Sequence, residues 1–281
     1  MEEMVSIIVP VYRAGAYIAE TIEMVEKQTY RNWELLLIDD CSPDNSAGII
    51  RDMIDRRNRM NGQDIADRPE KKNFAEPEAA GRKPEAPVER IRLIRKEKNE
   101  GAARARNTGI EHARGRYIAF LDADDIWFPE KLEKELAFLK EKQAAFVFTA
   151  YEFGNEKAEG TGKIVQVPAQ LTYRKALSRT VIFTSTVLLD REKISGELIR
   201  MPVVESEDTA TWWKILRNGY TAYGLNEPLV IYRRPAKSLS SNKFVAMKRI
   251  WNLYRREEKL AVPVSVFCFC MWAIRATVRR I

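Results

Sequence analysis

Groups that several common enzyme classes require are scarce in this sequence. Its single histidine, His112, lies in a polar segment predicted to be helical and far from any plausible nucleophile, which disfavours Ser–His–Asp and Cys–His catalysis. The three cysteines, Cys41, Cys268 and Cys270, lack the paired C-x-x-C spacing of zinc and redox sites. We interpret them as small apolar residues in a reducing compartment, and we expect a fold that does not depend on disulfides.

Three nucleotide-handling motifs are also absent. The segment from Val11 to Gly15 follows the first predicted strand but lacks the G-x-G-x-x-G of dinucleotide-binding enzymes. Around Gly162 and Lys163 the first glycine and the final Ser or Thr of a P-loop are missing. The glycine-rich, arginine-bearing loop with which sugar nucleotidyltransferases begin is missing as well. These absences disfavour a dehydrogenase, a P-loop enzyme and a nucleotidyltransferase.

No apolar run is long enough to cross a membrane. The longest charge-free tract, Leu260 to Ile274, is interrupted by Pro263 and falls short of the roughly 18 to 20 residues that a spanning helix needs. Met1 is followed by two glutamates rather than by a basic and then an apolar segment, so no signal peptide is expected. The sequence therefore predicts a cytoplasmic protein without a transmembrane helix.

Basic charge is concentrated at the C-terminus. The net charge of +7 equals the excess of nine Lys and Arg over two Glu within residues 243–281, so the rest of the chain is neutral. Apolar residues such as Phe267 and Trp272 stand beside Arg275 there, a combination that suits acidic lipid headgroups on the inner face of the plasma membrane. Packing of this segment on its own domain is the alternative. A basic membrane- or nucleic-acid-binding module is a rival function, although we expect no nucleic-acid partner.

The first 150 residues alternate strand-like and helix-like segments. Strands are predicted at 5–9, 34–38, 91–94, 117–121 and 145–149, and helices at 17–27, after 44, at 102–113 and at 129–142. Later strands are predicted at 164–167, 181–189, 221–225 and 229–232, and later helices at 173–178 and 209–217. This alternation predicts an α/β fold with a mainly parallel sheet and helices on both of its faces.

The predicted organisation is one large domain, residues 1–240, followed by a basic helical segment, residues 241–281. Between residues 57 and 90 the apolar pattern lapses, and four of the 12 prolines fall there. We interpret residues 57–90 as an inserted, disordered loop without chemistry of its own.

Acidic residues end two of the predicted strands, where ligands of open parallel sheets bind. Asp39 and Asp40 end the second strand. Asp122 and Asp124 follow the fourth strand and flank one small residue, so the two-residue period of a strand directs both carboxylates to one side. Carboxylates without His or Cys nearby suit Mg²⁺ or Mn²⁺, which also binds diphosphate oxygens. An acidic turn before the helix at Pro129 is the alternative.

Four segments occur in order along the chain: Ser6 to Tyr12, Leu37 to Ser42, Asn99 to Ile110, and Gly115 to Asp125. They read SIIVPVY, LIDDCS, NEG followed by ARNTGI, and GRYIAFLDADD. Together, at these spacings, they resemble the signatures of family 2 glycosyltransferases with a GT-A fold, a Rossmann-like fold that binds nucleotide-diphospho-sugars. The resemblance covers residues 4 to 240 apart from the inserted loop, which is longer than the family usually has. The Q-x-x-R-W signature of processive synthases is absent.

The resemblance implies roles for the residues at the strand ends. Nucleotide binding would fall to five residues, with Asp40 accepting from the pyrimidine N–H and Asp122 lying by the ribose: Pro10, Tyr12, Asp40, Arg106 and Asp122. The metal ion, Mn²⁺ or Mg²⁺, would be held by Asp124, where it neutralises the leaving diphosphate.

A second acidic pair, Glu207-Asp208, precedes a predicted helix that carries Trp212. The resemblance implies that Asp208 is the general base that takes a proton from the acceptor hydroxyl, in one displacement that inverts the anomeric carbon. Weaker signals place Glu207, Trp212 and Arg233 at the diphosphate or the acceptor. Either Trp212 or Trp213 would stack on the acceptor sugar, and one of the two is expected in the core. Arg233 and the stretch from Ser238 to Ser241 resemble the family's loop that closes over the diphosphate, where Arg233 would bind a phosphate bidentately. An acidic helix start stabilised by the helix dipole is the alternative for the acidic pair.

The resemblance extends to partners. The donor is expected to be a UDP-sugar, and the acceptor a glycan or polyprenyl-linked glycan of bacterial cell-surface polysaccharide synthesis, such as teichuronic acid or capsule. A glycoside hydrolase that pairs Asp124 with Asp208 is a second rival function, but it leaves the aspartates of the second strand unexplained.

Overall fold

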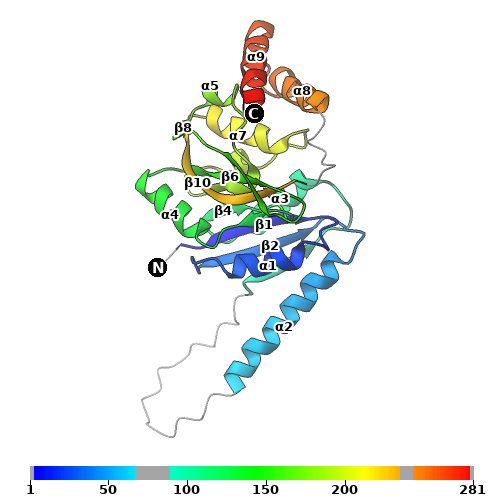
Figure 1. The fold of residues 1–281 in the computed structure, drawn as a ribbon. Coiled ribbons are helices and arrows are strands. Elements are labelled where there is room, and N and C mark those ends of the chain that lie inside the picture. Colours follow the sequence, from blue (N-terminus) through cyan, green and yellow to red (C-terminus); the bar gives the residue numbers. More distant parts are fainter. Residues whose placement is uncertain (1–2, 67–88, 235–242, 279–281) are drawn as a thin grey trace.

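The computed structural model describes residues 3–66, 89–234 and 243–278. At its centre lies one mixed sheet (Figure 1). In sheet order its strands are β3 (Ile91–Arg95), β2 (Trp33–Asp39), β1 (Val5–Val11), β4 (Tyr117–Phe120), β9 (Val187–Asp190), β6 (Phe146–Gly154), β10 (Ala222–Arg233) and β5 (Ile126–Trp127). Two further strands, β7 (Gly160–Val165) and β8 (Gln170–Leu171), pair with β6 and β10.

The longest strand pairings are parallel. β1 pairs in parallel with β2 and β4, β2 with β3, and β6 with β10, whereas the antiparallel pairings of β5, β7, β8 and β9 are short. In register, Val11 lies beside Asp39, and Ile8 beside Phe120. The carboxyl ends of β1, β2 and β4 therefore meet at one edge of the sheet. Nearly every residue of these strands is buried, as expected for parallel strands covered on both faces.

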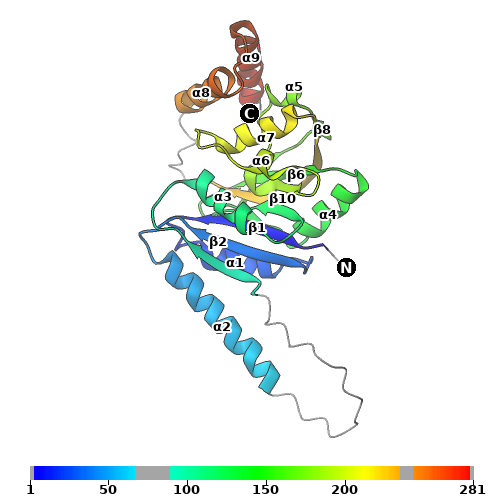
Figure 2. The same cartoon turned by 180° about the vertical axis from the view of Figure 1, so that it is seen from behind.

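Helices cover both faces of the sheet, and this confirms the predicted α/β class (Figures 1 and 2). The helices before the C-terminal segment are α1 (Ile18–Glu26), α2 (Ser46–Ala66), α3 (Ala102–His112), α4 (Lys131–Glu141), α5 (Tyr173–Ala176), α6 (Gly196–Ile199) and α7 (Glu207–Arg217). The chain moves outward from β1 to β3 through α1 and α2, and returns through α3 to β4 on the other side of β1. Right-handed crossovers place the outward and returning helices on opposite faces.

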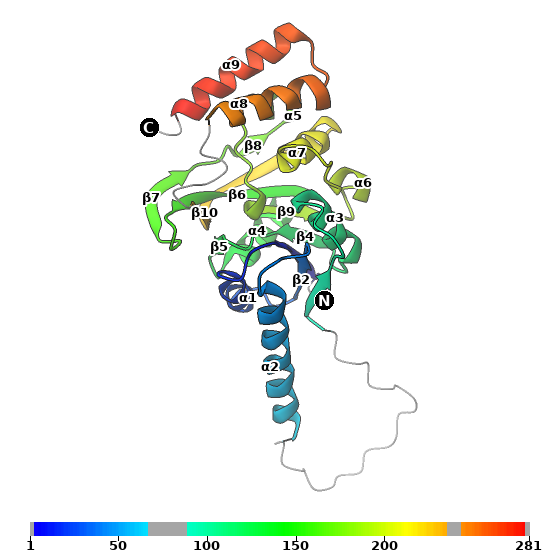
Figure 3. The same ribbon diagram turned by 90° about the vertical axis from the view of Figure 1, so that its right-hand side faces the viewer.

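Helix α2 contradicts part of the predicted loop at residues 57–90. The helix continues to Ala66 and extends away from the sheet, as Figures 1 and 3 show. Its second half needs no apolar stripe because it has no sheet to cover, so the lapse of the pattern at Arg57 was misread as the end of the helix. Residues 67–88 of the predicted loop lie outside the described residues, and its last two residues, 89 and 90, lead directly into β3.

Two strand predictions also differ from the structure. The predicted strand at 181–189 begins only at Val187, because a short 3₁₀ turn, η1 (Thr184–Thr186), precedes it. The strands predicted at 221–225 and 229–232 form one strand, β10, with irregular register around Pro228. Proline has no N–H for the ladder, and a bulge tolerates that loss.

The C-terminal segment forms α8 (Lys243–Asn252), a π-helical turn η3 (Leu253–Glu257) and α9 (Val262–Val278). Figure 3 shows α8 and α9 over the end of the molecule that carries α5 and β8. Tyr254 stacks on Trp213 of α7 at a centroid distance of 5.3 Å, and Trp272 Nε1 donates to Thr180 Oγ1 at 2.9 Å. One side of the segment therefore packs on the domain. Among the described residues, no helix combines the length and apolarity needed to span a membrane.

Candidate active site

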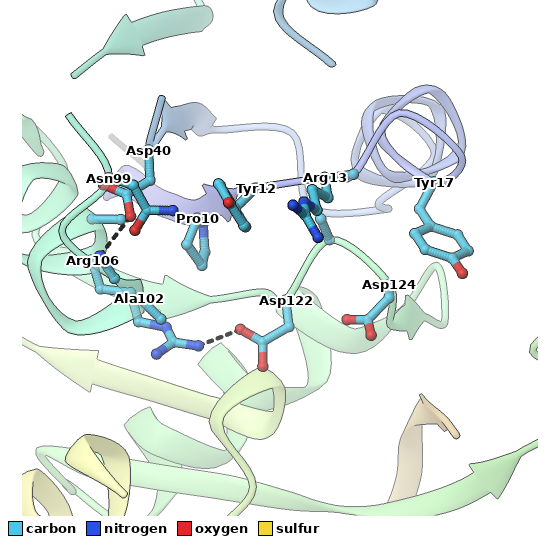
Figure 4. Close-up of a pocket in the computed structure, with 14 residues that line it drawn as sticks. Pro10, Tyr12, Arg13, Tyr17, Asp40, Asn99, Ala102, Arg106, Asp122 and Asp124 are labelled. Carbon is cyan, nitrogen blue, oxygen red and sulfur yellow. Dashed lines mark hydrogen bonds and ion pairs between the residues drawn. The ribbon is translucent and has the colours of Figure 1, made fainter. Parts of the chain in front are cut away.

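A cleft of about 590 Å³ opens where the carboxyl ends of β1, β2 and β4 meet (Figure 4). The start of α3, with the small side chains of Ala102 and Ala105, forms a second wall, and the segment between β1 and α1 that contains Arg13 and Tyr17 forms a third. The structure brings six of the predicted site residues to this cleft: Pro10, Tyr12, Asp40, Arg106, Asp122 and Asp124. Their proximity follows from the parallel register of three strands that lie far apart in sequence.

Asp40 is buried at the end of β2 and fixes the loop that leads into α3. Its carboxylate accepts from Lys96 Nζ at 2.7 Å, from the Glu100 N–H at 3.1 Å and from the Gly101 N–H at 2.6 Å. Gly101 has a φ of 88°, a conformation that favours glycine. Asp40 therefore shapes the cleft wall through three protein donors, in addition to any contact with a ligand.

Arg106 joins the two acidic groups of the site, the aspartates that follow β4 and the Glu207-Asp208 pair at the start of α7. Its guanidinium is buried, and it donates to Asp122 Oδ1 at 2.5 Å and to Glu207 Oε1 at 2.8 Å. Burial alone would lower the pKa of Arg106, but the nearby carboxylates of Asp122 and Glu207 outweigh it and raise that pKa. Arg106 is thus a permanent cation between the end of β4 and the start of α7.

The three aspartates after β4 repel one another. Burial, and then the charge of Asp122, raise the pKa of Asp124. Burial, with the charges of Asp122 and Asp124, also raises the pKa of Asp125. Figure 4 shows the carboxylates of Asp122 and Asp124 side by side at the cleft. A cation bound between them would relieve this repulsion.

The donor set fits Mg²⁺ or Mn²⁺ only in the presence of a ligand that brings further oxygens. Within the described ranges, no group of three or more His, Cys, Asp or Glu side chains is arranged to hold a metal ion. Mg²⁺ commonly takes one or two carboxylates and completes its shell with substrate phosphates and water. Asp122 and Asp124 offer that number of carboxylates.

The predicted base, Asp208, lies at the start of α7, next to Glu207. Its Oδ2 accepts from Thr184 Oγ1 at 3.2 Å. Ser185, which follows Thr184 in the chain, donates its hydroxyl to Asp125 Oδ2 at 2.5 Å, and the same hydroxyl oxygen accepts a hydrogen bond from the Asp122 N–H at 3.0 Å. The turn η1 therefore connects the two acidic groups a second time. Sequence reasoning missed Thr184, Ser185 and the structural role of Asp125, because the turn lay inside a predicted strand.

Glu207 is also perturbed. Burial raises its pKa, the charge of Arg106 opposes that shift, and the charge of Asp208 adds to it. Glu207 faces Arg106 and so serves the bridge described above. Contact of Glu207 with the diphosphate or the acceptor stays a prediction.

The predicted stacking of Trp212 on the acceptor sugar is contradicted. The Trp212 ring is 1% exposed and packs against Phe120 at 5.9 Å and Phe146 at 5.4 Å between ring centroids. Trp213, the neighbouring aromatic, is 2% exposed beneath Tyr254. Both indoles belong to the core because α7 is covered on two sides, by the sheet and by the C-terminal segment.

Arg233 ends β10 beside the acidic cluster. Its Nε donates to the Asp124 carbonyl oxygen at 2.7 Å, and its Nη2 donates to Glu20 Oε2 at 2.6 Å. The guanidinium also lies 4.7 Å from the centre of the Tyr17 ring. Arg233 is thus close to the predicted metal ligand, but a phosphate would have to displace Glu20 to bind it bidentately. The loop at 238–241, predicted to close over the diphosphate, lies outside the described residues.

Comparison with known proteins identifies the family. The family model described as Glycosyl transferase family 2 matches residues 6–81 and 82–190. TuaG of Bacillus subtilis, whose name describes a teichuronic acid biosynthesis glycosyltransferase, is 38% identical over 279 residues, which are 99% of this chain and 98% of TuaG. WfgD of Escherichia coli is 36% identical over 251 residues, 89% of this chain and 85% of WfgD. Its name describes a UDP-Glc:alpha-D-GlcNAc-diphosphoundecaprenol beta-1,3-glucosyltransferase.

Solved structures agree on the fold. TarS 1-349 of S. aureus, in complex with UDP-GlcNAc, superposes with a TM-score of 0.64 at 18% identity over 96% of this chain and 71% of that one. The mannosyltransferase PcManGT of Pyrobaculum calidifontis, in complex with GDP-Man and Mn²⁺, superposes with a TM-score of 0.65 at 18% identity over 96% of this chain and 69% of that one. At this identity the likeness concerns the fold alone. The chain therefore belongs to glycosyl transferase family 2, and it is a glycosyltransferase with the GT-A fold.

Proposed function

We propose that this glycosyltransferase transfers a sugar from a UDP-sugar to a hydroxyl of a polyprenyl-diphosphate-linked glycan in the synthesis of a bacterial cell-surface polysaccharide. The observation that carries the proposal is the bridge through Arg106, which holds Asp122 of the donor side to Glu207, the neighbour of Asp208. The name of WfgD, with UDP-glucose as donor and a diphosphoundecaprenol-linked acceptor, supports the choice of substrates.

On the donor side, Pro10, Tyr12 and Asp40 hold the base, and Asp122 with Arg106 holds the ribose end of the nucleotide. All five line the same cleft. Asp124 is the principal ligand of a divalent cation, which when bound supplies positive charge to the leaving diphosphate. Its raised pKa means that it binds a cation best once the pH is high enough to ionise it.

On the acceptor side, Asp208 removes the proton of the attacking hydroxyl. Thr184 donates to Oδ2 of Asp208, which leaves lone pairs of that carboxylate for the acceptor. A single displacement from the face opposite the nucleotide inverts the anomeric carbon. General-base catalysis of this kind contributes typically 10² to 10⁴ in rate.

The C-terminal segment keeps the enzyme at the inner face of the plasma membrane, where such an acceptor resides. Several apolar side chains of α9 are exposed on the side away from the domain, among them Phe267 at 66% and Ile274 at 59%. This peripheral contact adds to, and does not replace, the packing of α9 on the domain.

The test is a donor screen by thermal shift with Mn²⁺ present, paired with turnover of the donor that binds. A ligand of the folded state raises the melting temperature by mass action. Asp124→Asn should abolish the Mn²⁺-dependent shift with UDP-glucose or a related donor. Asp208→Asn should keep the shift and lose at least about a hundredfold in turnover. Glu111→Gln, on the surface of α3, is the matched control and should change neither.

The outcomes separate the proposal from its rivals. Equal loss of donor binding in Asp124→Asn and Asp208→Asn would contradict the division of roles. Cleavage of a simple glycoside without any nucleotide would favour a hydrolase that uses the same carboxylates. Tight, salt-sensitive binding of nucleic acid without any donor-dependent shift would favour the basic binding module.

A further inference from the structure

A second cavity, of about 400 Å³, lies between α5 and α9. Four of its lining residues are cations, and no lining residue is acidic: Arg174, Lys175, Arg179 and Arg275. We call this cavity the basic groove. It is separate from the active site, since the two share no lining residue. The function of the enzyme as described above makes no use of it.

One cation of the groove is held in place by the domain. Arg275 of α9 donates to the Ser178 carbonyl oxygen at 3.2 Å and to the Ser178 hydroxyl, which holds its guanidinium against the domain. Arg174 and Lys175 follow one another on α5 and are exposed. Cations gathered in one hollow attract an anion with several oxygens, and guanidinium groups match phosphate geometry particularly well.

An exposed apolar surface adjoins the groove. Phe267 and Ile274 lie seven residues apart on α9, hence on one side of the helix, and Arg275 directly follows Ile274. Val266, between Ser265 and Phe267, is 45% exposed. From Val262 to Ala276, Arg275 is the only charged residue in the sequence. A phosphate site beside an exposed, uncharged helix side matches the two layers of a membrane surface, headgroup and acyl chain.

The diphosphate of the acceptor is a poor occupant of the groove. Gln170, which lines the groove, pairs with Tyr223 near the start of β10, whereas Arg233 at the other end of β10 contacts Asp124. Because β10 is irregular between these points, the paired strand β6 gives the separation: Tyr223 lies beside Val147 and Arg233 beside Gly154, seven residues or roughly 23 Å at about 3.3 Å per residue. One sugar unit cannot bridge that distance. The groove thus lies too far from the reacting atoms to hold a diphosphate attached to the acceptor sugar.

We propose that the basic groove binds the phosphate of an anionic phospholipid headgroup while the exposed side of α9 enters the adjoining acyl boundary. The proposal rests on the membrane contact proposed above and names its lipid class and its residues. Each Lys or Arg near an anionic surface contributes about 1 kcal/mol at physiological ionic strength. Two such residues correspond to about a thirtyfold change in partitioning.

The experiment is flotation of the full chain with vesicles of phosphatidylcholine alone or mixed with phosphatidylglycerol. Wild type should prefer the mixed vesicles, and salt should weaken this preference. Arg174→Gln/Lys175→Gln should reduce partitioning to mixed vesicles about thirtyfold and leave the melting temperature and the turnover of a soluble acceptor unchanged. The matched control, Lys27→Gln/Lys157→Gln, removes two exposed cations elsewhere and should retain the wild-type preference.

A second variant, Phe267→Ser/Ile274→Ser, separates the groove from the membrane contact. It should weaken binding to both kinds of vesicle. If it does so while the groove variant floats like wild type, the membrane contact stands and the groove proposal is overturned. If wild type floats with neither vesicle, the membrane contact fails and the groove proposal fails with it. If inorganic phosphate raises the melting temperature of wild type but not of the groove variant, and flotation shows no preference for phosphatidylglycerol, the groove binds a soluble anion and the lipid proposal is overturned.

Discussion

Replacement of Arg106 by methionine should destabilise the protein strongly, because Arg106 is a buried charge shared by two carboxylates. Methionine keeps much of the volume but leaves Asp122 and Glu207 without the donors that lie at 2.5 and 2.8 Å in the structure. Removal of one partner from a buried ion pair costs about 3 to 5 kcal/mol, and the lower end of this range applies here because the side chains of Asp122 and Glu207 are 28% and 21% exposed. For a protein of this size the melting temperature should fall by roughly 10 °C.

The pH dependence gives this prediction its sharpest test. Burial raises the pKa of Glu207 and the charge of Arg106 opposes that shift, so Arg106→Met should raise this pKa further. Below the unfolded value near 4.5, Glu207 is protonated in both the folded and the unfolded state. As the pH rises through the folded pKa, the folded state has to ionise a buried carboxyl, and stability is lost. The deficit of the variant should therefore grow from acidic toward neutral pH.

Urea unfolding at several pH values measures the deficit, and Arg106→Met/Glu207→Gln closes a double-mutant cycle. Glu207→Gln removes the carboxylate whose ionisation is costly, so the double variant should recover part of the lost stability, and its remaining deficit should lose most of its pH dependence. A deficit below about 1 kcal/mol, or one that does not change with pH, would refute the argument that Arg106 neutralises the start of α7.

Three further predictions concern the described contacts. Lys131 and Glu135 form a fully buried ion pair at 2.5 Å, so Lys131→Met should lower the free energy of unfolding in urea by about 3 to 5 kcal/mol. Adding Glu135→Leu should restore most of that stability; a double variant as unstable as Lys131→Met alone would contradict this account. Thr184→Val removes the hydroxyl donor to Asp208 and should lower kcat about tenfold, or about 1.4 kcal/mol, with the donor KM unchanged. Gly115→Ala places a Cβ 2.5 Å from a backbone carbonyl oxygen and should cost about 1 to 3 kcal/mol, measured by thermal unfolding.

The strand ends could be predicted from sequence because the physics there is local. The runs that end at Val11, Asp39 and Phe120 are mainly apolar, as strands buried on both faces are, with Ser6, Glu34 and Asp39 the polar exceptions, and polar residues follow each of them. Parallel register then brings those polar residues together without any knowledge of the loops. This is why the cleft contains the predicted donor-side residues.

The burial of Trp213 could not be predicted because it depends on a segment that follows about forty residues later in the chain, whereas Trp212 is buried by Phe120 and Phe146 of the sheet. Helical spacing shows that Trp212 and Trp213 point in directions about 100° apart, so one indole on each side of α7 was a reasonable expectation. The structure covers the second side with Tyr254 of η3, which buries Trp213 as well. No pattern within α7 carries that information.

The turn η1 was missed for a related reason. The sequence around Thr184 and Ser185 contains β-branched and aromatic residues, and these favour a strand. The strand instead begins only at Val187, because both hydroxyls pair with carboxylates of the site, Thr184 with Asp208 and Ser185 with Asp125. Such pairing is a tertiary effect that overrides local propensity.

The contacts of α7 relate the C-terminal segment to catalysis. The helix begins with Glu207 and Asp208, and it ends with Arg217, whose guanidinium pairs with Glu258 at 2.9 Å, immediately after η3. Trp213 stacks on Tyr254 between these two points. The membrane contact proposed for α9 would therefore act, through η3, on the same helix that carries the proposed base. In that case one set of packing contacts would set both the orientation of the enzyme on the bilayer and the direction from which an acceptor reaches Asp208.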